Sequence, residues 1–363
     1  MFEPAPAQSM LQAGTQQMLP PESQPMLSRQ AQQLQHSQMQ PGLHIETPLL
    51  QHRQLSAASG RAVWLKLDNL QPSGSFKLRG IGLLCQRAIA AGATDLVCPS
   101  GGNAGFAAAV AGVALGVRTT VVVPSTTAAA VVEAIAAIGA TVVVHGVVWD
   151  EANGEALRLC GQEGVVYIPP FDHPAIWNGN ATVIDEAVRQ LALVQTEAGN
   201  ASDSASDSFD VVICSVGGGG LLCGVLEGLH RNGMAQVPVL AVETAGAASY
   251  AAALAAGTPV RLDAITSVAT SLGARQVAQA AVDWRLRHDI TSVVVSDADA
   301  VDACLRFAAD LRMLVEPACG AALAVAYGDL PVLQRFRRPL FIVCGGIAVD
   351  LATLASLKQR FAL

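Results

Sequence analysis

A chain of 363 residues, 52% apolar and only 14% charged, can bury one large core or two of ordinary size. Its net charge is −7 without a basic patch, and its seven histidines lack H-E-x-x-H or zinc-site spacing. No apolar run reaches the length of a membrane span without a Gly or polar interruption. We therefore expect a globular protein whose partners are neither nucleic acid nor a membrane.

The first 42 residues are rich in Gln, Pro and Met and show no sustained periodicity. We predict a disordered tail there, with weak helical potential at 27–39. A basic stretch followed by an apolar one, as in a secretory signal, does not occur in this segment. Regular structure is predicted to begin near residues 45–49.

Strand-like and helix-like patterns alternate along the rest of the chain. Apolar strand-like runs lie at residues 62–67, 96–98, 119–123, 141–144, 165–168, 211–216, 237–242, 292–295 and 340–344. Helical windows between them include residues 102–115, 127–138, 151–160, 176–194 and 219–231. Strands that are apolar throughout and alternate with helices predict an α/β fold with parallel sheets covered on both faces. The polar, acidic, Ser-rich segment 195–208 is predicted to be a flexible loop.

The chain contains only three lysines, and Lys77 is the candidate for covalent chemistry. Lys66 lies inside an apolar strand pattern, and Lys358 lies in an amphipathic helical pattern near the C-terminus. Lys77 instead occupies a Gly/Ser-rich turn between a strand-like and a helix-like run. Lysine forms Schiff bases with carbonyls, including the aldehyde of pyridoxal phosphate. The alternative is a solvated lysine at the start of a helix.

Four successive glycines, residues 217–220, follow a strand-like run and open a helical window. Without side chains, the backbone there can direct several N–H groups at one anion beside the positive helix N-terminus. We interpret this segment as a phosphate cradle, with an ordinary strand-to-helix turn as the alternative. It matches neither G-x-G-x-x-G nor G-x-x-x-x-G-K-[ST], which disfavours a dinucleotide or ATP.

Two further polar segments end predicted strands. The turn at residues 100–105 (SGGNAG) offers a hydroxyl, an amide and backbone N–H groups that could hold a carboxylate; a plain helix cap is the alternative. The segment 343–346 (VCGG) places Cys344 at the carboxyl edge of a sheet, where ligands of α/β proteins bind. Its alternative is a buried structural cysteine. Together with Lys77 and the glycines, these segments supply what pyridoxal-phosphate chemistry on an amino acid requires.

The eight cysteines form no C-x-x-C pair, and most lie inside apolar runs. They are predicted to be reduced core thiols of a cytoplasmic protein.

Five segments, in this order, carry a resemblance to a known family: residues 72–80 (PSGSFKLRG), 100–105, 217–222, 316–322 (EPACGAA) and 343–346. The chain resembles the serine/threonine dehydratases, which are fold type II pyridoxal-phosphate enzymes, and among them the serine dehydratase and serine dehydratase-like branch. The resemblance runs from about residue 47 to the end. It implies two domains, each an open twisted mostly parallel sheet, as in the tryptophan synthase β chain. The large domain would comprise residues 43–74 and 172–363, and the small domain residues 75–171.

The resemblance also implies roles for individual residues. Lys77 would form the Schiff base and remove the α-proton, and Phe76 would pack on the cofactor ring. Asn103 would bind the ring hydroxyl, Cys344 would approach the pyridine nitrogen, and the phosphate would be held by Gly217, Gly218, Gly219 and Gly220. The substrate carboxylate would be held by Ser100, Gly101, Gly102 and Asn103. A monovalent-cation site, usually for K⁺, would be formed by Glu243, Ala247, Ser249, Leu272 and Ala274, unless Glu243 is a carboxylate of a surface loop.

The implied reaction is elimination of the β-hydroxyl of L-serine or L-threonine, which gives pyruvate or 2-oxobutanoate and ammonia. Serine racemases resemble this family but place a serine where this chain has Gly101, so elimination is favoured over racemisation. The alternatives are a fold type II racemase or β-replacement enzyme, and a protein that binds the cofactor without turnover. A homodimer is expected from the resemblance.

Overall fold

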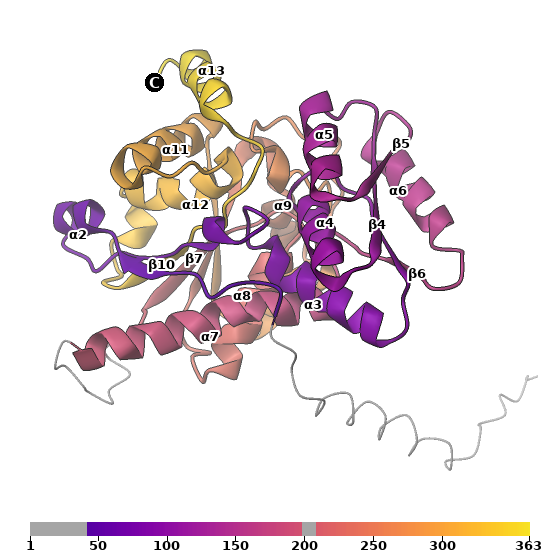
Figure 1. Cartoon of the computed structure of the whole chain (residues 1–363). Coiled ribbons are helices and arrows are strands. Elements are labelled where there is room, and N and C mark those ends of the chain that lie inside the picture. Colours follow the sequence, from indigo (N-terminus) through magenta and orange to yellow (C-terminus); the bar gives the residue numbers. More distant parts are fainter. Residues whose placement is uncertain (1–41, 198–207) are drawn as a thin grey trace, which may run out of the picture. The chain divides into compact units, whose positions relative to one another are not determined.

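Two sheets organise the part of the chain that the computed structural model describes, residues 42–197 and 208–363 (Figure 1). The larger sheet has six strands in the order β1-β2-β10-β7-β8-β9. Their bounds are β1 Leu49–Gln51, β2 Trp64–Lys66, β7 Val211–Ser215, β8 Val239–Thr244, β9 Ile290–Val295 and β10 Pro339–Ile342. Only β1 pairs antiparallel, as an edge strand; the other pairs are parallel.

The smaller sheet has four parallel strands in the order β5-β4-β3-β6. Their bounds are β3 Asp95–Cys98, β4 Arg118–Val123, β5 Thr141–Val144 and β6 Val165–Tyr167. Successive side chains of a strand point to opposite faces. Leu96 and Cys98 accordingly pack on one side with helices α3 and α4, while Val97 and Val122 pack on the other side with α6.

Helices cover both sides of the sheets. They are α2 Arg53–Ser59, α3 Lys77–Ala90, α4 Asn103–Leu115, α5 Ala129–Ile138, α6 Trp149–Leu159, α7 Pro174–Glu197, α8 Gly220–Arg231, α9 Ser249–Ala256, α10 Gln279–Asp283, α11 Asp297–Leu311, α12 Pro317–Tyr327 and α13 Leu351–Phe361. In Figure 1, α11 and α12 lie on one side of β10 and β7, and α7 and α8 lie on the other. The predicted α/β fold with parallel-dominated sheets is therefore confirmed.

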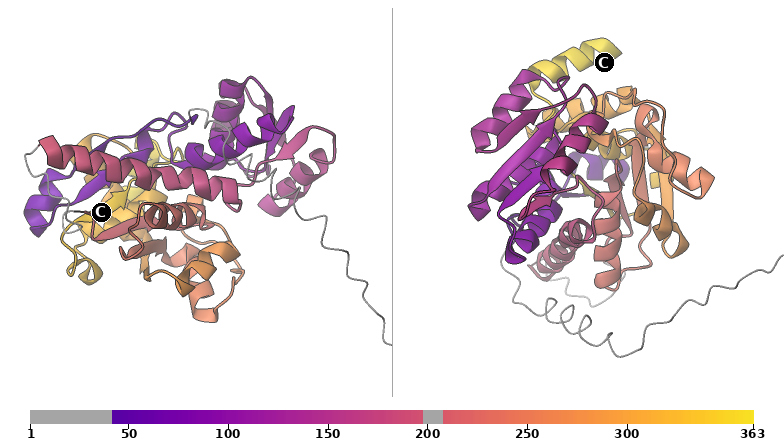
Figure 2. Two further views of the ribbon diagram at one scale, coloured as in Figure 1. Left: turned by 90° about the horizontal axis from the view of Figure 1, so that it is seen from below. Right: turned by 90° about the vertical axis from the view of Figure 1, so that its right-hand side faces the viewer.

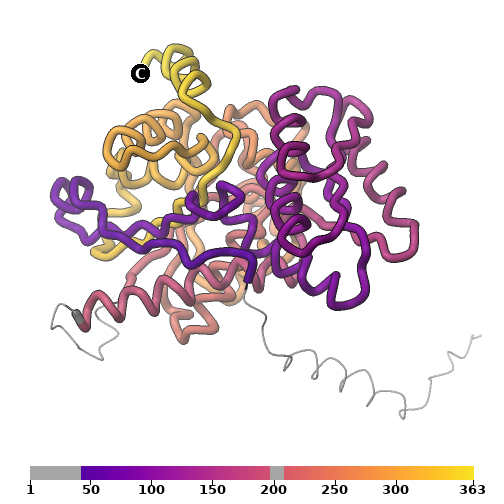
Figure 3. Tube along the Cα trace, in the orientation of Figure 1, coloured from indigo at the N-terminus to yellow at the C-terminus, as the bar shows by residue number. Residues whose placement is uncertain are grey.

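The chain crosses between the sheets twice. Figure 3 shows it leaving β2 for α3 and the smaller sheet, and returning through α7 to β7. The 24-residue helix α7 packs on α8 beside the larger sheet and on α3 beside the smaller one (Figure 2). The smaller sheet takes its strands from within the predicted small domain, and the larger sheet from within the predicted large domain. The division into two domains at those boundaries stays a prediction.

Short 3₁₀ turns complete the connections: Asp68–Leu70, Ala245–Ala247, Thr270–Leu272, Trp284–Leu286 and Pro331–Leu333. The predicted tail falls almost wholly on residues 1–41, which lie outside the described residues. So do residues 198–207 of the predicted loop; α7 continues to Glu197, so the first residues of that segment are helical. None of the described helices is both long and apolar enough to cross a membrane.

Candidate active site

Most of the predicted site residues come together in one cavity of about 780 Å³ at the carboxyl ends of β3, β7 and β10. The lining contains the residues predicted to bind cofactor and substrate: Phe76, Lys77, Ser100, Gly101, Gly102, Asn103, Gly217, Gly218, Gly219, Gly220 and Cys344. It also contains Leu272 and Ala274 of the predicted cation site, whereas Glu243, Ala247 and Ser249 do not line it. The volume lies within the range of about 300–1,000 Å³ typical of small-molecule sites.

Lys77 is the first residue of α3, and the turn before it is joined to the end of β10. Phe76 N donates to Cys344 O at 3.0 Å, and Gly346 N donates to Gly74 O at 2.9 Å. The Nζ of Lys77 donates to the carbonyl oxygen of Pro170 at 2.5 Å. Burial lowers the pKa of Lys77 to about 8, although nearby cysteines and Glu316 favour its charged form. The amine is therefore held at the cavity and is more easily deprotonated than an ordinary lysine.

Arg79, two residues further along α3, ties the first turn of that helix to the larger sheet. Its guanidinium is fully buried and donates to both carboxylate oxygens of Asp68 at 2.6 and 2.7 Å. It also donates to both carboxylate oxygens of Glu186 on α7, at 2.7 and 2.8 Å. Burial opposes the charge on both Arg79 and Glu186, but their contacts raise the pKa of Arg79 and hold that of Glu186 below its usual range.

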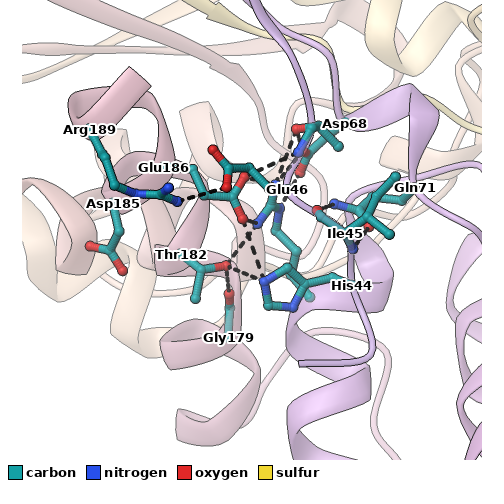
Figure 4. Close-up of polar contacts among 12 residues, drawn as sticks. His44, Ile45, Glu46, Asp68, Gln71, Gly179, Thr182, Asp185, Glu186 and Arg189 are labelled. Atoms are coloured by element: carbon teal, nitrogen blue, oxygen red, sulfur yellow. Dashed lines mark hydrogen bonds and ion pairs between the residues drawn. The ribbon is translucent and has the colours of Figure 1, made fainter. Parts of the chain in front are cut away.

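Lys66 belongs to the same buried cluster of charged side chains. Its Nζ donates to Glu186 Oε2 at 2.7 Å and to Thr47 O at 2.6 Å. Figure 4 shows His44, Thr182 and Asp68 around the Glu186 carboxylate. With Arg79, which contacts Asp68 and Thr182, four separate segments of the chain meet there. Because both cations are matched by carboxylates, the cluster fixes the base of α3, and hence Lys77, relative to β2 and α7.

The glycine segment 217–220 forms a cradle at the start of α8. Gly219 caps the helix with φ at +91°, a conformation that favours glycine. A Cβ on Gly218 would lie 2.3 Å from the Phe171 ring, so the close approach of these two segments excludes a side chain there. Beside the cradle, the buried hydroxyl of Ser215 lacks a hydrogen-bond partner among the described residues. A backbone surface at a helix N-terminus, with an unpartnered hydroxyl beside it, fits a phosphate group.

Asn103 is the first residue of α4, and its side-chain amide is held from both ends. Its Oδ1 accepts from Ile347 N at 3.0 Å, and its Nδ2 donates to Glu316 Oε1 at 2.8 Å. A longer contact of 3.3 Å joins Nδ2 to the hydroxyl of Ser271. Glu316, which lines the cavity, received no role from the sequence; the signal was a lone acidic residue before Pro317 in an apolar stretch.

Gly101 faces side chains from the end of β4 and from the loop after it. A Cβ on Gly101 would lie 3.0 Å from Thr127 Cγ2 and 3.2 Å from Val123 Cγ1. The space that a serine side chain would need at this position is therefore partly filled by Thr127.

Cys344 is buried at the cavity, and its thiol pKa is raised by a contact with the Cys319 thiol and by burial. It therefore faces the cavity as a neutral thiol rather than as an anion.

Glu243 is fully buried at the end of β8, so the alternative of a surface-loop carboxylate is wrong. Its two oxygens accept from Tyr250 N at 2.7 Å and Ala251 N at 2.8 Å, at the start of α9. Burial raises the pKa of Glu243 to about 7. The nearby Ser249 hydroxyl is buried and unpartnered among the described residues. No group of three His, Cys, Asp or Glu side chains suited to a metal ion occurs in the described residues.

Comparison with known proteins gives concordant matches. A family described as "Pyridoxal-phosphate dependent enzyme" matches residues 42–345. The human protein "L-serine dehydratase/L-threonine deaminase" is 46% identical over 318 residues, which is 85% of this chain and 93% of the human one. The rat protein "Serine dehydratase-like" is 46% identical over 314 residues, 84% of this chain and 91% of the rat one. The crystal structure of a fungal L-serine ammonia-lyase from Rhizomucor miehei matches with a TM-score of 0.80 and 34% identity, covering 88% of this chain and 99% of that one.

Proposed function

This chain belongs to the pyridoxal-phosphate dependent enzyme family, and we propose that it is an L-serine and L-threonine ammonia-lyase. The reaction eliminates the β-hydroxyl of the amino acid and gives pyruvate or 2-oxobutanoate with ammonia. The observation that carries the proposal is the placement of Lys77, the glycine cradle and the Ser100–Asn103 loop around one cavity. The names of the human, rat and fungal relatives supply the substrate class.

The residues present fit pyridoxal phosphate. The cradle at 217–220 suits the phosphate, Phe76 and Cys344 would contact the ring, Asn103 would bind its hydroxyl, and Lys77 would be the covalent anchor. When bound, the cofactor supplies an electron sink that stabilises negative charge at the α-carbon of an amino acid. The neutral thiol of Cys344 suits an unprotonated pyridine nitrogen, because it does not supply the negative charge that would favour protonation.

Lys77 is assigned the proton chemistry at the α-carbon. A general base works best when its pKa lies near the working pH, and burial brings the pKa of Lys77 down to about 8. Ser100 to Asn103 present backbone N–H groups at the N-terminus of α4, which would orient the substrate carboxylate. In this proposal the protein therefore makes two contributions: the 100–103 loop orients the substrate carboxylate, and Lys77 transfers the proton at the α-carbon.

Elimination is favoured over racemisation at this site. Racemisation needs an acid on the face opposite Lys77, and Gly101 offers no side chain there. Thr127 and Val123 also restrict the room above Gly101. Serine and threonine differ by one methyl group, worth about 1–3 kcal/mol in a pocket, so both are assigned as substrates.

The test measures product from purified protein supplied with pyridoxal phosphate. Pyruvate from L-serine is followed with lactate dehydrogenase, and 2-oxobutanoate from L-threonine in the same way. Lys77→Ala should abolish both products, and the exposed Lys358→Ala should leave them unchanged. Pyruvate release that survives in Lys77→Ala would refute the mechanism. D-serine that accumulates faster than pyruvate would identify a racemase, and cofactor binding without either product would identify a carrier.

Three further assignments accompany the function. We assign K⁺ to the Glu243 region, supported by the buried carboxylate and the unpartnered Ser249 hydroxyl. A homodimer follows from the resemblance and is tested by light scattering after gel filtration. A cytoplasmic location is supported by the eight cysteines, all of which are free.

A further inference from the structure

Glu316 is a buried carboxylate at the cavity that the elimination chemistry leaves without a task. Its residue is 2% exposed, and burial raises its pKa. Burying a carboxylate is costly unless hydrogen bonds or charges compensate for the lost water. A structural reason or a functional one must therefore account for its presence among the apolar residues at the start of α12.

Helix capping does not account for it. Glu316 is the N-cap residue of α12, yet its side chain makes no capping hydrogen bond; only its backbone oxygen accepts from Cys319 N and Gly320 N. The carboxylate instead turns away from its own helix. Oε1 accepts from Asn103 Nδ2 at 2.8 Å, and Oε2 accepts from Ala348 N at 3.2 Å.

The carboxylate and the Asn103 amide complete a chain of hydrogen bonds between three segments. Ile347 N donates to Asn103 Oδ1 at 3.0 Å, Asn103 donates to Glu316, and Ala348 N donates to Glu316. This order allows the Asn103 amide only one orientation. Turned by 180°, its NH₂ group would face the N–H of Ile347, and its oxygen would face a carboxylate oxygen.

The backbone has a special shape where the carboxylate lies. Gly346 has φ at +128°, and a Cβ there would come within 1.9 Å of Glu316 Cδ. The second glycine of the 343–346 segment is therefore required for the carboxylate to reach Asn103. No local sequence pattern indicates this requirement for glycine at position 346.

We propose that Glu316 is a positioning residue, which fixes the Asn103 amide so that its NH₂ group is available to the ring hydroxyl of the cofactor. One N–H of Nδ2 is taken by Glu316, and the other makes the weaker 3.3 Å contact with Ser271. The second N–H is the one that a cofactor oxygen can take over. The inference rests on the proposed cofactor role of Asn103, and it assigns Glu316 no contact with the substrate.

The test is a double-mutant cycle with cofactor affinity as the readout. The apo-forms of wild type, Glu316→Ala, Asn103→Ala and the double variant are titrated with pyridoxal phosphate, and the visible absorption band of each complex is recorded. We expect Glu316→Ala and Asn103→Ala each to bind pyridoxal phosphate about tenfold more weakly than wild type does. The absorption bands of the two complexes should be shifted from that of wild type by the same amount. The double variant should be no weaker than Asn103→Ala, because residues that act through one contact are not additive.

Glu316→Gln separates positioning from folding. Its amide keeps the size of the side chain but can accept from only one of Asn103 Nδ2 and Ala348 N, so an intermediate loss of affinity and a partial band shift are expected. Glu227→Gln on α8, a partly buried carboxylate that does not line the cavity, is the matched control and should bind as wild type does. Circular dichroism identifies any variant that fails to fold. If Glu316→Ala does not fold, the affinity and band of Glu316→Gln test the proposal instead.

Additive losses in the cycle would overturn the proposal, as would an unchanged band and affinity in both Glu316 variants. Failure of the wild type to bind pyridoxal phosphate at all would overturn the proposed function instead. Binding with an additive cycle would overturn only the role of Glu316.

Discussion

The Nζ of Lys77 donates a hydrogen bond of 2.5 Å to the carbonyl oxygen of Pro170, which lies in the connection between β6 and α7. The contact holds the amine beside the phosphate cradle, because the next residue, Phe171, packs against Gly218 and Gly220. At the pKa of about 8 that burial gives Lys77, about a tenth of the amine is neutral at pH 7. An ordinary lysine, with a pKa near 10.5, has roughly 1 in 3,000 neutral at that pH.

Loading of the apo-protein with pyridoxal phosphate should therefore depend on pH in a specific way. The neutral amine attacks the aldehyde, so the rate constant of loading should rise with pH and level off above about 8. Stopped-flow absorbance at a series of pH values measures it, with Lys77→Ala as the blank. A rate that keeps rising towards pH 10 would show that the amine has an ordinary pKa.

Replacing Arg79 by Met should destabilise the protein by about 3–5 kcal/mol, because it leaves the Asp68 and Glu186 carboxylates buried without that cation. Arg79→Lys should recover part of the loss, since it keeps the charge but cannot serve both carboxylates in the same planar geometry. Urea unfolding followed by circular dichroism gives the free energies.

The matched control for Arg79 is Arg118, which makes a comparable pair of hydrogen bonds to Asp95 while its side chain is 83% exposed. Arg118→Met should unfold at the same urea concentration as wild type, because exposed ion pairs add little. Equal effects of the two substitutions would show that burial of the Arg79 cluster has no special importance.

The fold could be predicted largely from local patterns. Every strand-like run in the sequence corresponds to an observed strand, because parallel strands covered on both sides are apolar along their length. The strand β1 was missed, since its three residues Leu49–Gln51 follow a proline and show no periodicity of their own. Its place as an antiparallel edge depends on pairing with β2, which no local pattern encodes.

In the candidate site, too, local features could be predicted from the sequence, whereas contacts between distant residues could not. The glycine turns and Lys77 were predictable, because each is a local turn signal at a strand end. The contact of Asn103 with Glu316 joins residues 213 positions apart, and that of Arg79 with Glu186 joins residues 107 positions apart. Such partners are set by the packing of α3, α4, α7 and α12 around the sheets, so no local sequence pattern indicates a role for either acidic residue.

Gly101→Ala should lower kcat/KM for L-serine by roughly tenfold, an effect on the order of 1.4 kcal/mol. The added methyl would press on Thr127 and Val123 and shift the loop that orients the carboxylate. Thr127→Ser in the same chain removes the methyl nearest to position 101 and should restore part of the rate. Gly154→Ala on α6, where an added Cβ meets open space, should leave kcat/KM unchanged. A Gly101→Ala enzyme as active as wild type would show that the space is not restricted.

Activity should depend on potassium, and more potassium should be needed at low pH. Without a cation, burial keeps the pKa of Glu243 at about 7, so the carboxylate is increasingly protonated as the pH falls below that value. A cation binds the ionised form, and the potassium concentration for half-maximal activation should therefore rise by about tenfold per pH unit below 7.

Rates are measured at pH 6, 7 and 8 with potassium exchanged for tetramethylammonium, each normalised to saturating potassium. Glu243→Gln should lose the potassium dependence at every pH. The same half-maximal concentration at pH 6 and 8 would mean that the cation does not bind this carboxylate.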